Sequence, residues 1–398
     1  MRIGMILDKE FPPDPRVANE AQTLIDAGFD VRLFCLNFKS EPKSEEINNL
    51  KINRFSMSKL FYDKFSPLVY TFPFFSLKVR DGIRNFIDAN KPDVIHIHDM
   101  VIAEAVFKIN KQHRLPIVLD LHENRPEIMK TYSHINKGIG KLLINLEKWE
   151  RKQREFIEKA DRVIVVTQEA KEDLLNECNI SSGKIIVVPN TVNLNIFLSY
   201  PISYDILDKY KDDFVVLYLG STGLRRGLDT AIKAVRFLKD KIPNLKLVIV
   251  GKSRDDKILM DLSENLGVKN QVVFEGWRDE SLFPSYIRAS KICISPLTRN
   301  RHHDTTYANK IFQYMSCGKP IIVSDCKAQK RIVEENQCGL VYKAGDHQDL
   351  ADKIFQLYID QNIQRSFGQN SLKAIFNKYQ WNFTSKELVE LYRKYERI

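Results

Sequence analysis

The stretch from Ala289 to Asp325 limits the fold most, because it reads as a strand, a loop, a helix and a second strand in that order. The residues from Lys291 to Ile294 predict a short buried strand, and PIIVSD, which follows Gly318, predicts the next one. The spacing between them predicts a helix over 305–317. Two strands joined through a helix are the unit of a doubly wound parallel sheet, so this stretch predicts an α/β protein.

The predicted helix has an apolar face and a polar face. Its apolar positions follow the i, i+3, i+4, i+7 spacing of a buried face: Ala308, Ile311, Phe312 and Met315. The other face carries Thr306, Lys310 and Gln313. Free N–H groups at a helix start attract anions, and Arg299 and Arg301 precede this helix, so we expect a phosphate or diphosphate there. An ordinary strand–helix unit with a solvated charged face is the alternative.

Length and charge narrow the class of protein. A chain of 398 residues suits two domains, and a net charge of +10 favours an anionic partner such as a nucleotide, a lipid surface or nucleic acid. The six cysteines are scattered without metal-binding spacing, so we expect free thiols, a cytoplasmic location and no metal. The sequence shows neither a signal peptide nor an apolar run long enough to span a membrane.

The first half opens with a strand, the proline-rich loop KEFPPD and a helix for which Asp14 is the expected N-cap. The loop lacks GxGxxG, so no dinucleotide cofactor is predicted. Two later strands, DVIHIHD and PIVLDLHE, end in polar residues that should converge on one crevice at the carboxyl edge of the sheet: His98, Asp99, His122 and Glu123. His96 is expected in the core. A metal site is only weakly indicated, because histidines on two strands fix no coordination geometry.

Residues 55–80 are crowded with aromatic side chains and interleaved with Lys59, Lys64, Lys78 and Arg80. Core packing is one interpretation of this segment. The other is a surface that rests on an anionic membrane, where aromatic rings lie at headgroup depth and lysines meet phosphates. The basic helix expected over 137–159 either extends that surface or is a solvated helix face.

The second half restarts the pattern after a polar, proline-bearing linker over 193–213. FVVLYLG predicts a strand, STGLRRG a loop and LDTAIKAVRFLKD a helix. The loop glycines permit close approach of the backbone, and Arg225 and Arg226 stand where a loop at a helix start meets phosphate oxygens. Taken alone, this loop could equally be an ordinary turn.

Nine segments, in this order, resemble the retaining glycosyltransferases of the GT-B fold, the large group 1 family that acts on bacterial and archaeal cell-surface glycans. They are DPRVANEAQTLIDAGFDV, DVIHIHD, LDLHENRPE, ADRVIVVT, KIIVVPNTVN, GSTGLRRGLDTAIKA, VVFEGW, NKIFQYMSCGKPIIVSD and YQW. The resemblance implies two Rossmann-like doubly wound domains that face each other across a cleft. Residues 1–195 would bind the acceptor, 196–378 would bind a nucleotide-sugar, and a helix over 379–398 would cross back to the first domain.

The resemblance also implies roles for particular residues. Arg226 and Lys310 match the basic positions that neutralise the donor diphosphate, UDP or GDP being the expected nucleotide, without a metal or cofactor. His122 matches the histidine that reaches the transferred sugar. The rest of the expected donor site is Gly223, Arg225, Gly276, Trp277, Thr305, Thr306 and Gln313. On the acceptor side it is Arg16, His98 and Glu123.

The sequence departs from the family pattern at three positions. The usual pair of glutamates falls on Thr305 and Gln313, and the arginine expected directly after the first loop glycine is Ser221. Gln313 can still bond ribose hydroxyls, but Thr305 is no carboxylate nucleophile, although Asp304 is adjacent. We therefore expect transfer on one face of the sugar, with the leaving phosphate oxygen taking the proton of the acceptor.

The expected function is thus transfer of a sugar, with retained anomeric configuration, to a glycan or lipid-linked acceptor in the synthesis of surface polysaccharide or glycolipid. The expected location is the cytoplasm, with peripheral attachment to the inner face of the membrane. The missing glutamates leave a non-catalytic relative that binds nucleotide-sugar or glycan as one alternative. An epimerase of sugar nucleotides, or a glycosyl phosphorylase of similar fold, is another. Nucleic-acid binding is not expected, because no recognised module is present.

Overall fold

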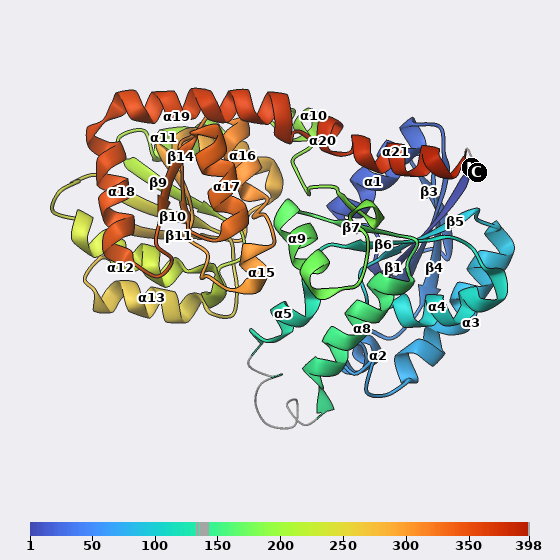
Figure 1. Ribbon diagram of the computed structural model, residues 1–398. Coiled ribbons are helices and arrows are strands. Elements are labelled where there is room, and N and C mark those ends of the chain that lie inside the picture. The colour runs from blue at the N-terminus through green and yellow to red at the C-terminus, as the bar shows by residue number, and fades with distance from the viewer. Residues whose placement is uncertain (133–134, 136–142, 397–398) are drawn as a thin grey trace. The chain divides into compact units, whose positions relative to one another are not determined.

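The computed structural model describes residues 1–132, 135 and 143–396. The chain forms two compact units (Figure 1). Unit 1 consists of Met1–Pro189 with Ser385–Ile398, and unit 2 consists of Asn190–Thr384. Each unit is built on a mainly parallel sheet that carries helices, which confirms the predicted α/β class.

The sheet of unit 1 has the strand order β3-β4-β2-β1-β5-β6-β7-β8. Its strands are β1 (Arg2–Glu10), β2 (Asp30–Asn37), β3 (Ser44–Ile47), β4 (Leu50–Ser56), β5 (Val94–His98), β6 (Ile117–Leu121), β7 (Arg162–Val165) and β8 (Ile185–Val187). The edge strand β3 pairs with β4 in the antiparallel direction, and the remaining pairs are parallel. The carboxyl ends of β1, β2, β4, β5 and β6 therefore open onto one edge of the sheet.

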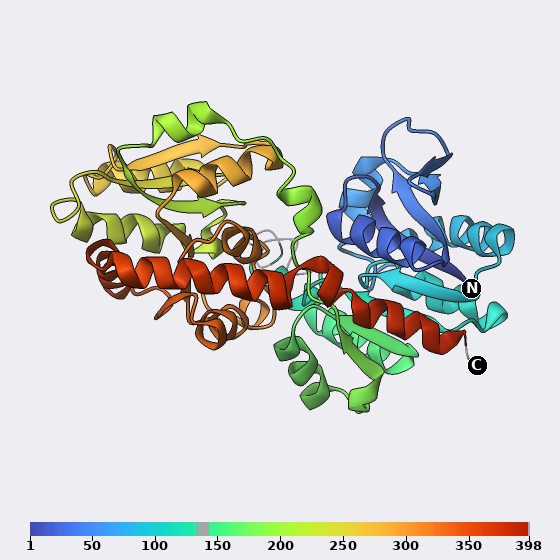
Figure 2. The same ribbon diagram turned by 90° about the horizontal axis from the view of Figure 1, so that it is seen from above.

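The helices described in unit 1 are α1 (Pro15–Asp26), α2 (Lys59–Phe65), α3 (Phe74–Asn90), α4 (Ala103–His113), α5 (Arg125–Met129), α8 (Leu146–Lys159), α9 (Gln168–Glu177) and α21 (Lys386–Tyr395), with a 3-10 turn at Ser182–Lys184. Asp14 caps α1 as predicted, because its carboxylate accepts a hydrogen bond from the backbone N–H of Val17 at 3.1 Å. The two chain ends lie side by side in this unit (Figures 1 and 2), where the Met1 amino group is 3.5 Å from Glu396 Oε1.

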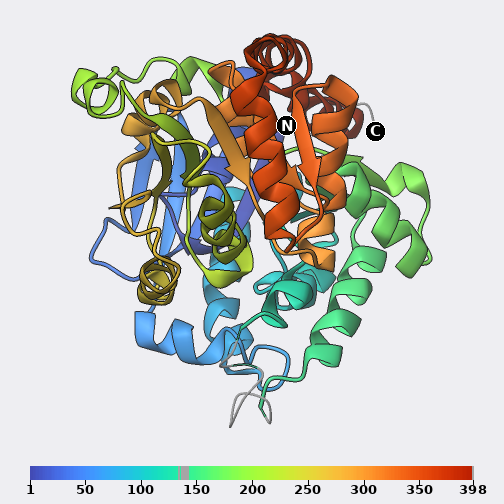
Figure 3. The same ribbon diagram turned by 90° about the vertical axis from the view of Figure 1, so that its left-hand side faces the viewer.

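The sheet of unit 2 has the order β11-β10-β9-β12-β13-β14 and is parallel throughout. Its strands are β9 (Phe214–Leu219), β10 (Leu245–Val250), β11 (Val272–Gly276), β12 (Ile292–Ser295), β13 (Ile321–Ser324) and β14 (Gly339–Tyr342). Alternate residues of β9 enter two different cores, Val216 and Tyr218 on one face and Leu217 and Leu219 on the other. Both faces of this sheet are therefore covered by helices (Figure 3), as a parallel sheet requires.

The helices of unit 2 are α10 (Leu194–Phe197), α11 (Tyr204–Lys209), α12 (Leu228–Leu238), α13 (Asp256–Asn265), α14 (Phe283–Ala289), α15 (Arg301–Asp304), α16 (Lys310–Ser316), α17 (Lys327–Asn336), α18 (His347–Ile359), α19 (Gln361–Ala374) and α20 (Trp381–Thr384). Short 3-10 turns η2 (Leu224–Arg226) and η3 (Glu280–Leu282) follow β9 and β11, and a π-helical turn covers Ile375–Tyr379.

The chain divides between the units at 189/190 and 384/385, whereas the sequence predicted boundaries after 195 and 378. The difference has a packing cause. Leu194 and Phe197 lie in the core of unit 2, so the supposed linker is part of that unit. The Trp381 N–H donates to the Val192 carbonyl at 3.0 Å, which holds α20 in unit 2 as well. Trp381, Leu388 and Leu391 of this tail are buried, whereas Phe383 is 41% exposed.

The aromatic segment 55–80 divides between core and surface. Tyr70 and Phe75 are buried, whereas Phe72 and Phe74 are exposed. In the basic helix, Lys137 and Lys141 lie outside the described residues, and Lys152 and Lys159 both contact Glu155. Among the described residues, no helix has the length and apolar character needed to cross a membrane.

Candidate functional site

Glycines end three neighbouring strands of unit 2 at its carboxyl edge. Gly220 follows β9, Gly251 follows β10 and Gly276 closes β11, with φ of +108°, +145° and +69°. These backbone conformations favour glycine over other residues. A Cβ on Gly251 would stand 1.9 Å from the Gly220 carbonyl oxygen, so the strand ends approach each other too closely for a side chain. Glycine backbone therefore allows the ends of β9 and β10 to pack closely together at this edge.

The loop after Gly220 brings two arginines to the same edge. Arg225 and Arg226 lie in η2, and Gly227, at φ +71°, leads into α12. The Arg225 carbonyl accepts hydrogen bonds from Thr298 N at 3.3 Å and Thr298 Oγ1 at 2.8 Å, which ties the loop to the segment after β12. The buried Nη1 of Arg225 has no hydrogen-bond partner among the described residues.

Lys310 adds a third cation. Its ammonium lies 3.5 Å from the ring centroid of Tyr218, and a Cβ on Gly220 would come within 3.3 Å of Nζ. Burial, and after it the charge of Arg226, hold the pKa of Lys310 well below its usual value. The sequence therefore placed Arg226 and Lys310 correctly at one strand end, although they are 84 positions apart.

Two histidines missed by the sequence reasoning complete this cluster. Burial, then His303, lowers the pKa of His302 to about 2, and the pKa of His303 is lowered to about 4, mainly by burial. Arg225 and Arg226 lower both values further. No described carboxylate is among the groups that set these pKa values or that of Lys310. Arg225, Arg226 and Lys310 therefore form a basic cluster at this edge that is suited to an anionic ligand. The segment Arg301–Asp304, with the sequence RHHD, was interpreted only as part of a loop. It is the sequence feature that could have identified the two histidines.

The helix predicted over 305–317 begins later, at Lys310. Thr305 and Thr306 instead close α15, because their hydroxyls donate to the carbonyls of Arg301 at 2.9 Å and His302 at 2.7 Å. The helix start that was expected to attract an anion therefore lies at Asn309 and Lys310 rather than at Thr305. The apolar face is confirmed, since Ala308, Ile311, Phe312 and Met315 are all buried. Arg299 is also not available as expected, because it pairs with Asp325 at 3.1 Å and Asp304 at 3.5 Å.

Gln313 contacts a carboxylate that the sequence reasoning did not single out. Its Nε2 donates to Glu280 Oε1 at 3.0 Å, and Glu280 belongs to η3, three residues beyond Trp277. Trp277 is 70% exposed beside Gly276, so a flat aromatic face is available at the end of β11. A carboxylate from another element thus stands next to the glutamine at the position where the family pattern has glutamate.

Unit 1 holds a buried cluster of charged groups at the ends of β5 and β6. Arg16 donates to Asp120 through Nη2 at 2.7 Å and Nε at 3.0 Å, and its Nη1 donates to the Val188 carbonyl at 3.0 Å. Its Nη2 is also 2.9 Å from Glu20 Oε1. Burial raises the pKa of Glu20 to about 8, whereas Arg16 and His122 together hold the pKa of Asp120 well below its usual range against the effect of burial.

His122 lies between two carboxylates of this cluster. Its Nε2 is 2.9 Å from Asp120 Oδ2, and its Nδ1 is 3.6 Å from Asp99 Oδ2. Burial alone would lower the pKa of His122, but Asp99 and then Asp120 raise it to about 9. At neutral pH the imidazole is therefore a cation, and both ring nitrogens carry protons. Asp99 has φ +62°, an uncommon backbone conformation at the strand end beside this histidine.

Burial corrects the expected roles of Arg16 and His98. Arg16 is 3% exposed and His98 is fully buried, so neither side chain can face an acceptor directly. His98 Nδ1 is 3.2 Å from His122 Nε2, so His98 can affect an acceptor only through His122. His96 is in the core as predicted, with Nδ1 2.6 Å from the Tyr392 hydroxyl. Glu123 is partly exposed and 3.3 Å from Arg125.

Four side chains of the cluster have the donor types of a metal site. Ligand atoms of Glu20, His96, His98 and Asp120 lie within 4.8 Å of one another. The guanidinium of Arg16 already contacts both carboxylates, however, and supplies the positive charge that balances them. A divalent ion would have to displace a buried, fully engaged arginine, so we assign no metal to this cluster.

Comparison with known proteins identifies two family models along the chain. The model of group 1 glycosyl transferases matches residues 202–374, and the model of glycosyltransferase family 4 matches residues 16–196. An uncharacterized glycosyltransferase of Methanocaldococcus jannaschii is 22% identical over 94% of this chain and 92% of its own.

Solved structures share the fold at low sequence identity. Sucrose-phosphate synthase from Thermosynechococcus elongatus superposes with a TM-score of 0.81 at 18% identity, covering 100% of this chain and 99% of its own. HepE of Anabaena, solved in complex with UDP, superposes with a TM-score of 0.72 at 17% identity, covering 99% of this chain and 100% of its own. These similarities confirm the expected GT-B fold class.

The charge state of His122 can be measured directly. We expect its imidazole to titrate near pH 9 and the change Asp99→Asn to lower that pKa by about 1–3 units, because the negative charge that raises the pKa most is removed. NMR titration of the histidine ring protons gives both values. Asp63→Asn, at an exposed carboxylate of the same unit, is the control and should leave them unchanged. An unshifted value in Asp99→Asn contradicts the assignment.

Proposed function

Because the chain belongs to the group 1 glycosyltransferases, we propose that it transfers a sugar from a nucleoside-diphosphate sugar to a glycan or lipid-linked acceptor with retained anomeric configuration. The observation that carries the proposal is the basic cluster at the end of β9, where Arg225, Arg226 and Lys310 gather beside Gly220. A diphosphate is the anion of matching size and charge. UDP is the first candidate, since the similar fold of HepE was solved with it.

Fixed cations supply the chemistry that this reaction needs most. When the bond between the anomeric carbon and the donor phosphate oxygen breaks, the nucleoside diphosphate leaves with added negative charge. Arg226 and Lys310 are proposed to stabilise that charge in place of a metal ion. The low pKa of Lys310 fits this role, because an arriving diphosphate favours the protonated amine and so strengthens the contact.

The ribose and base are proposed to lie along α16 from the diphosphate. Lys310 and Gln313 are three residues apart on this helix, about 4.5 Å along its axis, which suits the step from a phosphate to the ribose. Glu280 contacts Gln313 and offers a carboxylate of the kind that binds ribose hydroxyls in nucleotide folds. Trp277 and the backbone of Gly276 then meet the base.

Same-face transfer is the proposed route, because the expected position offers no nucleophile. Thr305 bonds to the backbone, and its neighbour Asp304 accepts a hydrogen bond from Lys327 N at 2.9 Å and contacts Arg299. The bond from the anomeric carbon to the phosphate oxygen breaks as the bond to the acceptor oxygen forms on the same face. The acceptor proton passes to the departing phosphate oxygen. In unit 1, His122 is proposed to donate a hydrogen bond to the sugar.

Nucleotide binding tests the proposal first. In a thermal-shift panel of UDP, GDP, ADP and dTDP, we expect one diphosphate to raise the melting temperature by several degrees, since ligand at a hundred times its Kd stabilises by about 2.7 kcal/mol. Lys310→Ala should weaken the binding of that ligand at least tenfold. Lys257→Ala, which changes an exposed lysine of the same unit, should leave the binding unchanged. If no diphosphate shifts the melt, or both variants respond like wild type, the donor site is misplaced.

The ribose contact has its own test. The wild type should bind the preferred nucleoside diphosphate about tenfold tighter than its 2′-deoxy form, because a charge-assisted hydrogen bond to the hydroxyl is lost. Glu280→Gln should bring the ratio close to one while retaining the deoxy affinity, measured by isothermal titration calorimetry. Glu264→Gln is the matched control on an exposed helix. An unchanged ratio in Glu280→Gln removes Glu280 from the ribose site.

Slow hydrolysis of the donor in the absence of acceptor reports catalysis and stereochemistry together. We expect an α-linked nucleotide-sugar to release the α-anomer first, observed by proton NMR before mutarotation, and Lys310→Ala to slow the release. The β-anomer as first product would overturn the same-face route. Binding without any turnover, even with glycan acceptors, would instead favour the non-catalytic relative, and conversion to an epimeric donor would favour the epimerase.

A further inference from the structure

A hollow of about 660 Å³ opens in unit 1 where β2 and β4 end. Three lysines stand around it, Lys39 and Lys43 from the loop after β2 and Lys78 from α3. Phe38, Met57 and Phe61 add apolar surface to its wall. The strands are parallel to β5 and β6, so the hollow opens at the same carboxyl edge of the sheet as His122.

The three lysines have no carboxylate partner among the described residues. Each is exposed, and none forms an ion pair within the described part of the chain, whereas the neighbouring Lys59 is paired with Asp63 at 2.8 Å. Glu41 is the single carboxylate among the residues that line the hollow. The hollow therefore has an excess of positive charge and attracts an anion.

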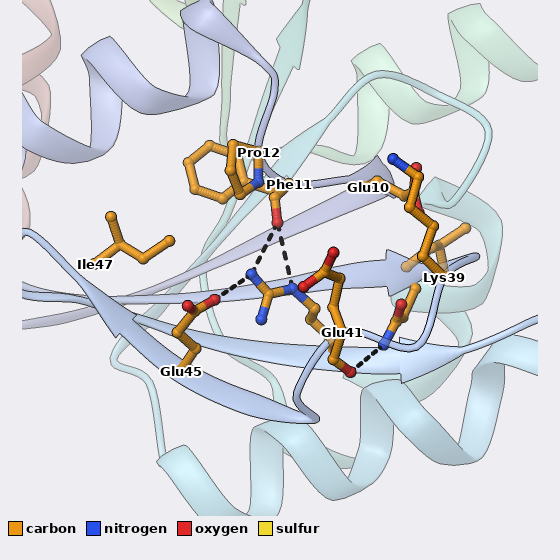
Figure 4. Close-up of a pocket in the computed structure, with 10 residues that line it drawn as sticks. Glu10, Phe11, Pro12, Lys39, Glu41, Glu45 and Ile47 are labelled. Carbon is orange, nitrogen blue, oxygen red and sulfur yellow. Dashed lines mark hydrogen bonds and ion pairs between the residues drawn. The ribbon is translucent and has the colours of Figure 1, made fainter.

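Side-chain hydrogen bonds hold the loop that carries Lys39 and Lys43 in place. Asn37 Nδ2 donates to the Glu41 carbonyl at 2.7 Å, and Arg54 Nη1 donates to the Pro42 carbonyl at 3.1 Å. Arg54 also donates to the Phe11 carbonyl at 3.1 Å and pairs with Glu45 at 2.6 Å, contacts that surround the smaller adjoining pocket in Figure 4. Lys39 and Lys43 therefore extend from a fixed backbone, which lowers the entropic cost of binding.

A continuous row of aromatic rings leads from the hollow to an exposed apolar patch. Phe61, in the wall, lies 4.6 Å from Phe65 between ring centroids, Phe65 lies 5.4 Å from Phe74, and Phe74 lies 5.8 Å from Phe72. Leu60 beside Phe61 is 82% exposed, and Leu77 beside Lys78 is 49% exposed. We call Leu60, Phe72, Phe74 and Leu77 the apolar patch. An anion-attracting hollow thus adjoins side chains that bury readily in a lipid surface.

We propose that the hollow binds the phosphate or diphosphate of a lipid-linked acceptor while the apolar patch rests in the headgroup region of the membrane. A free anion would contact the lysines but not the apolar patch, and an uncharged lipid would contact the patch but not the lysines. An amphipathic anion contacts both. The proposal rests on the proposed function and names the class of its acceptor. It also assigns the membrane-facing side of unit 1 to α2 and the start of α3.

Co-sedimentation of the full chain with vesicles tests the proposal. The vesicles are phosphatidylcholine with and without a minor fraction of phosphatidic acid, which carries a terminal phosphate. The triple change Lys39→Gln, Lys43→Gln and Lys78→Gln should weaken binding to the phosphate-bearing vesicles on the order of a hundredfold, since each basic residue at such a surface contributes about fivefold. Lys211→Gln, Lys257→Gln and Lys373→Gln together change the net charge equally from exposed sites of unit 2 and should not.

Equal binding by the two triple variants would overturn the proposal, because attraction would then follow overall charge alone. Phe74→Ser with Leu77→Ser should also weaken binding, and an unchanged value would remove the apolar patch from the interface. Inorganic phosphate is the soluble probe: if it saturates the hollow as tightly as the vesicles do, the lipid source is wrong. The thermal shift with the preferred nucleoside diphosphate should stay at wild-type size in the lysine variant. Its absence in wild type would reject the donor site and leave the vesicle result standing.

Discussion

The two parallel sheets confine polar chemistry to the ends of their strands. Strands such as β9 are apolar on both faces, so a charged group inside them would be separated from water and unpaired. Side chains that can bind a ligand therefore collect where the strands stop, and in both units this is the carboxyl edge. The glycines at the ends of β9, β10 and β11 follow from the same constraint, because backbone rather than side chains must fill the narrow space between strand ends.

Unit 1 contains one exception, because its buried cluster includes polar side chains that lie inside strands. Asp120 and His98 lie in strands and are fully buried, so the charge of Asp120 and the ring nitrogens of His98 require partners inside the protein. Arg16 from α1 provides the main one, and Tyr392 from α21 contacts His96 on the far side. The arrangement fixes where α1 and α21 sit on the sheet, and it gives His122 a charge that an exposed histidine would lack at neutral pH.

A feature of the fold or of the candidate site can be predicted from the sequence when it depends on residues that are close together in the chain. Strand ends with polar residues are local, so the sequence alone places His122, Arg226 and Lys310 at the correct edges of the sheets. The late start of α16 is not predictable from spacing, because it depends on two threonine hydroxyls that close α15 against the backbone. Burial of Arg16 and His98 depends on contacts with residues far away in the chain, such as Asp120 for Arg16. Glu280 meets Gln313 only through the fold.

The balance of charge separates the roles of the two units. In unit 1 the cations Arg16 and His122 are already matched by the carboxylates of Asp99 and Asp120, so the cluster has little net attraction for a further anion. In unit 2 burial lowers the pKa values of Lys310, His302 and His303, and the positive charge of Arg226 lowers all three further. Because an anion relieves repulsion only where positive charge is unbalanced, this difference supports the proposal that the diphosphate binds to unit 2. Under the same proposal, the imidazolium of unit 1 acts on the neutral sugar as a hydrogen-bond donor.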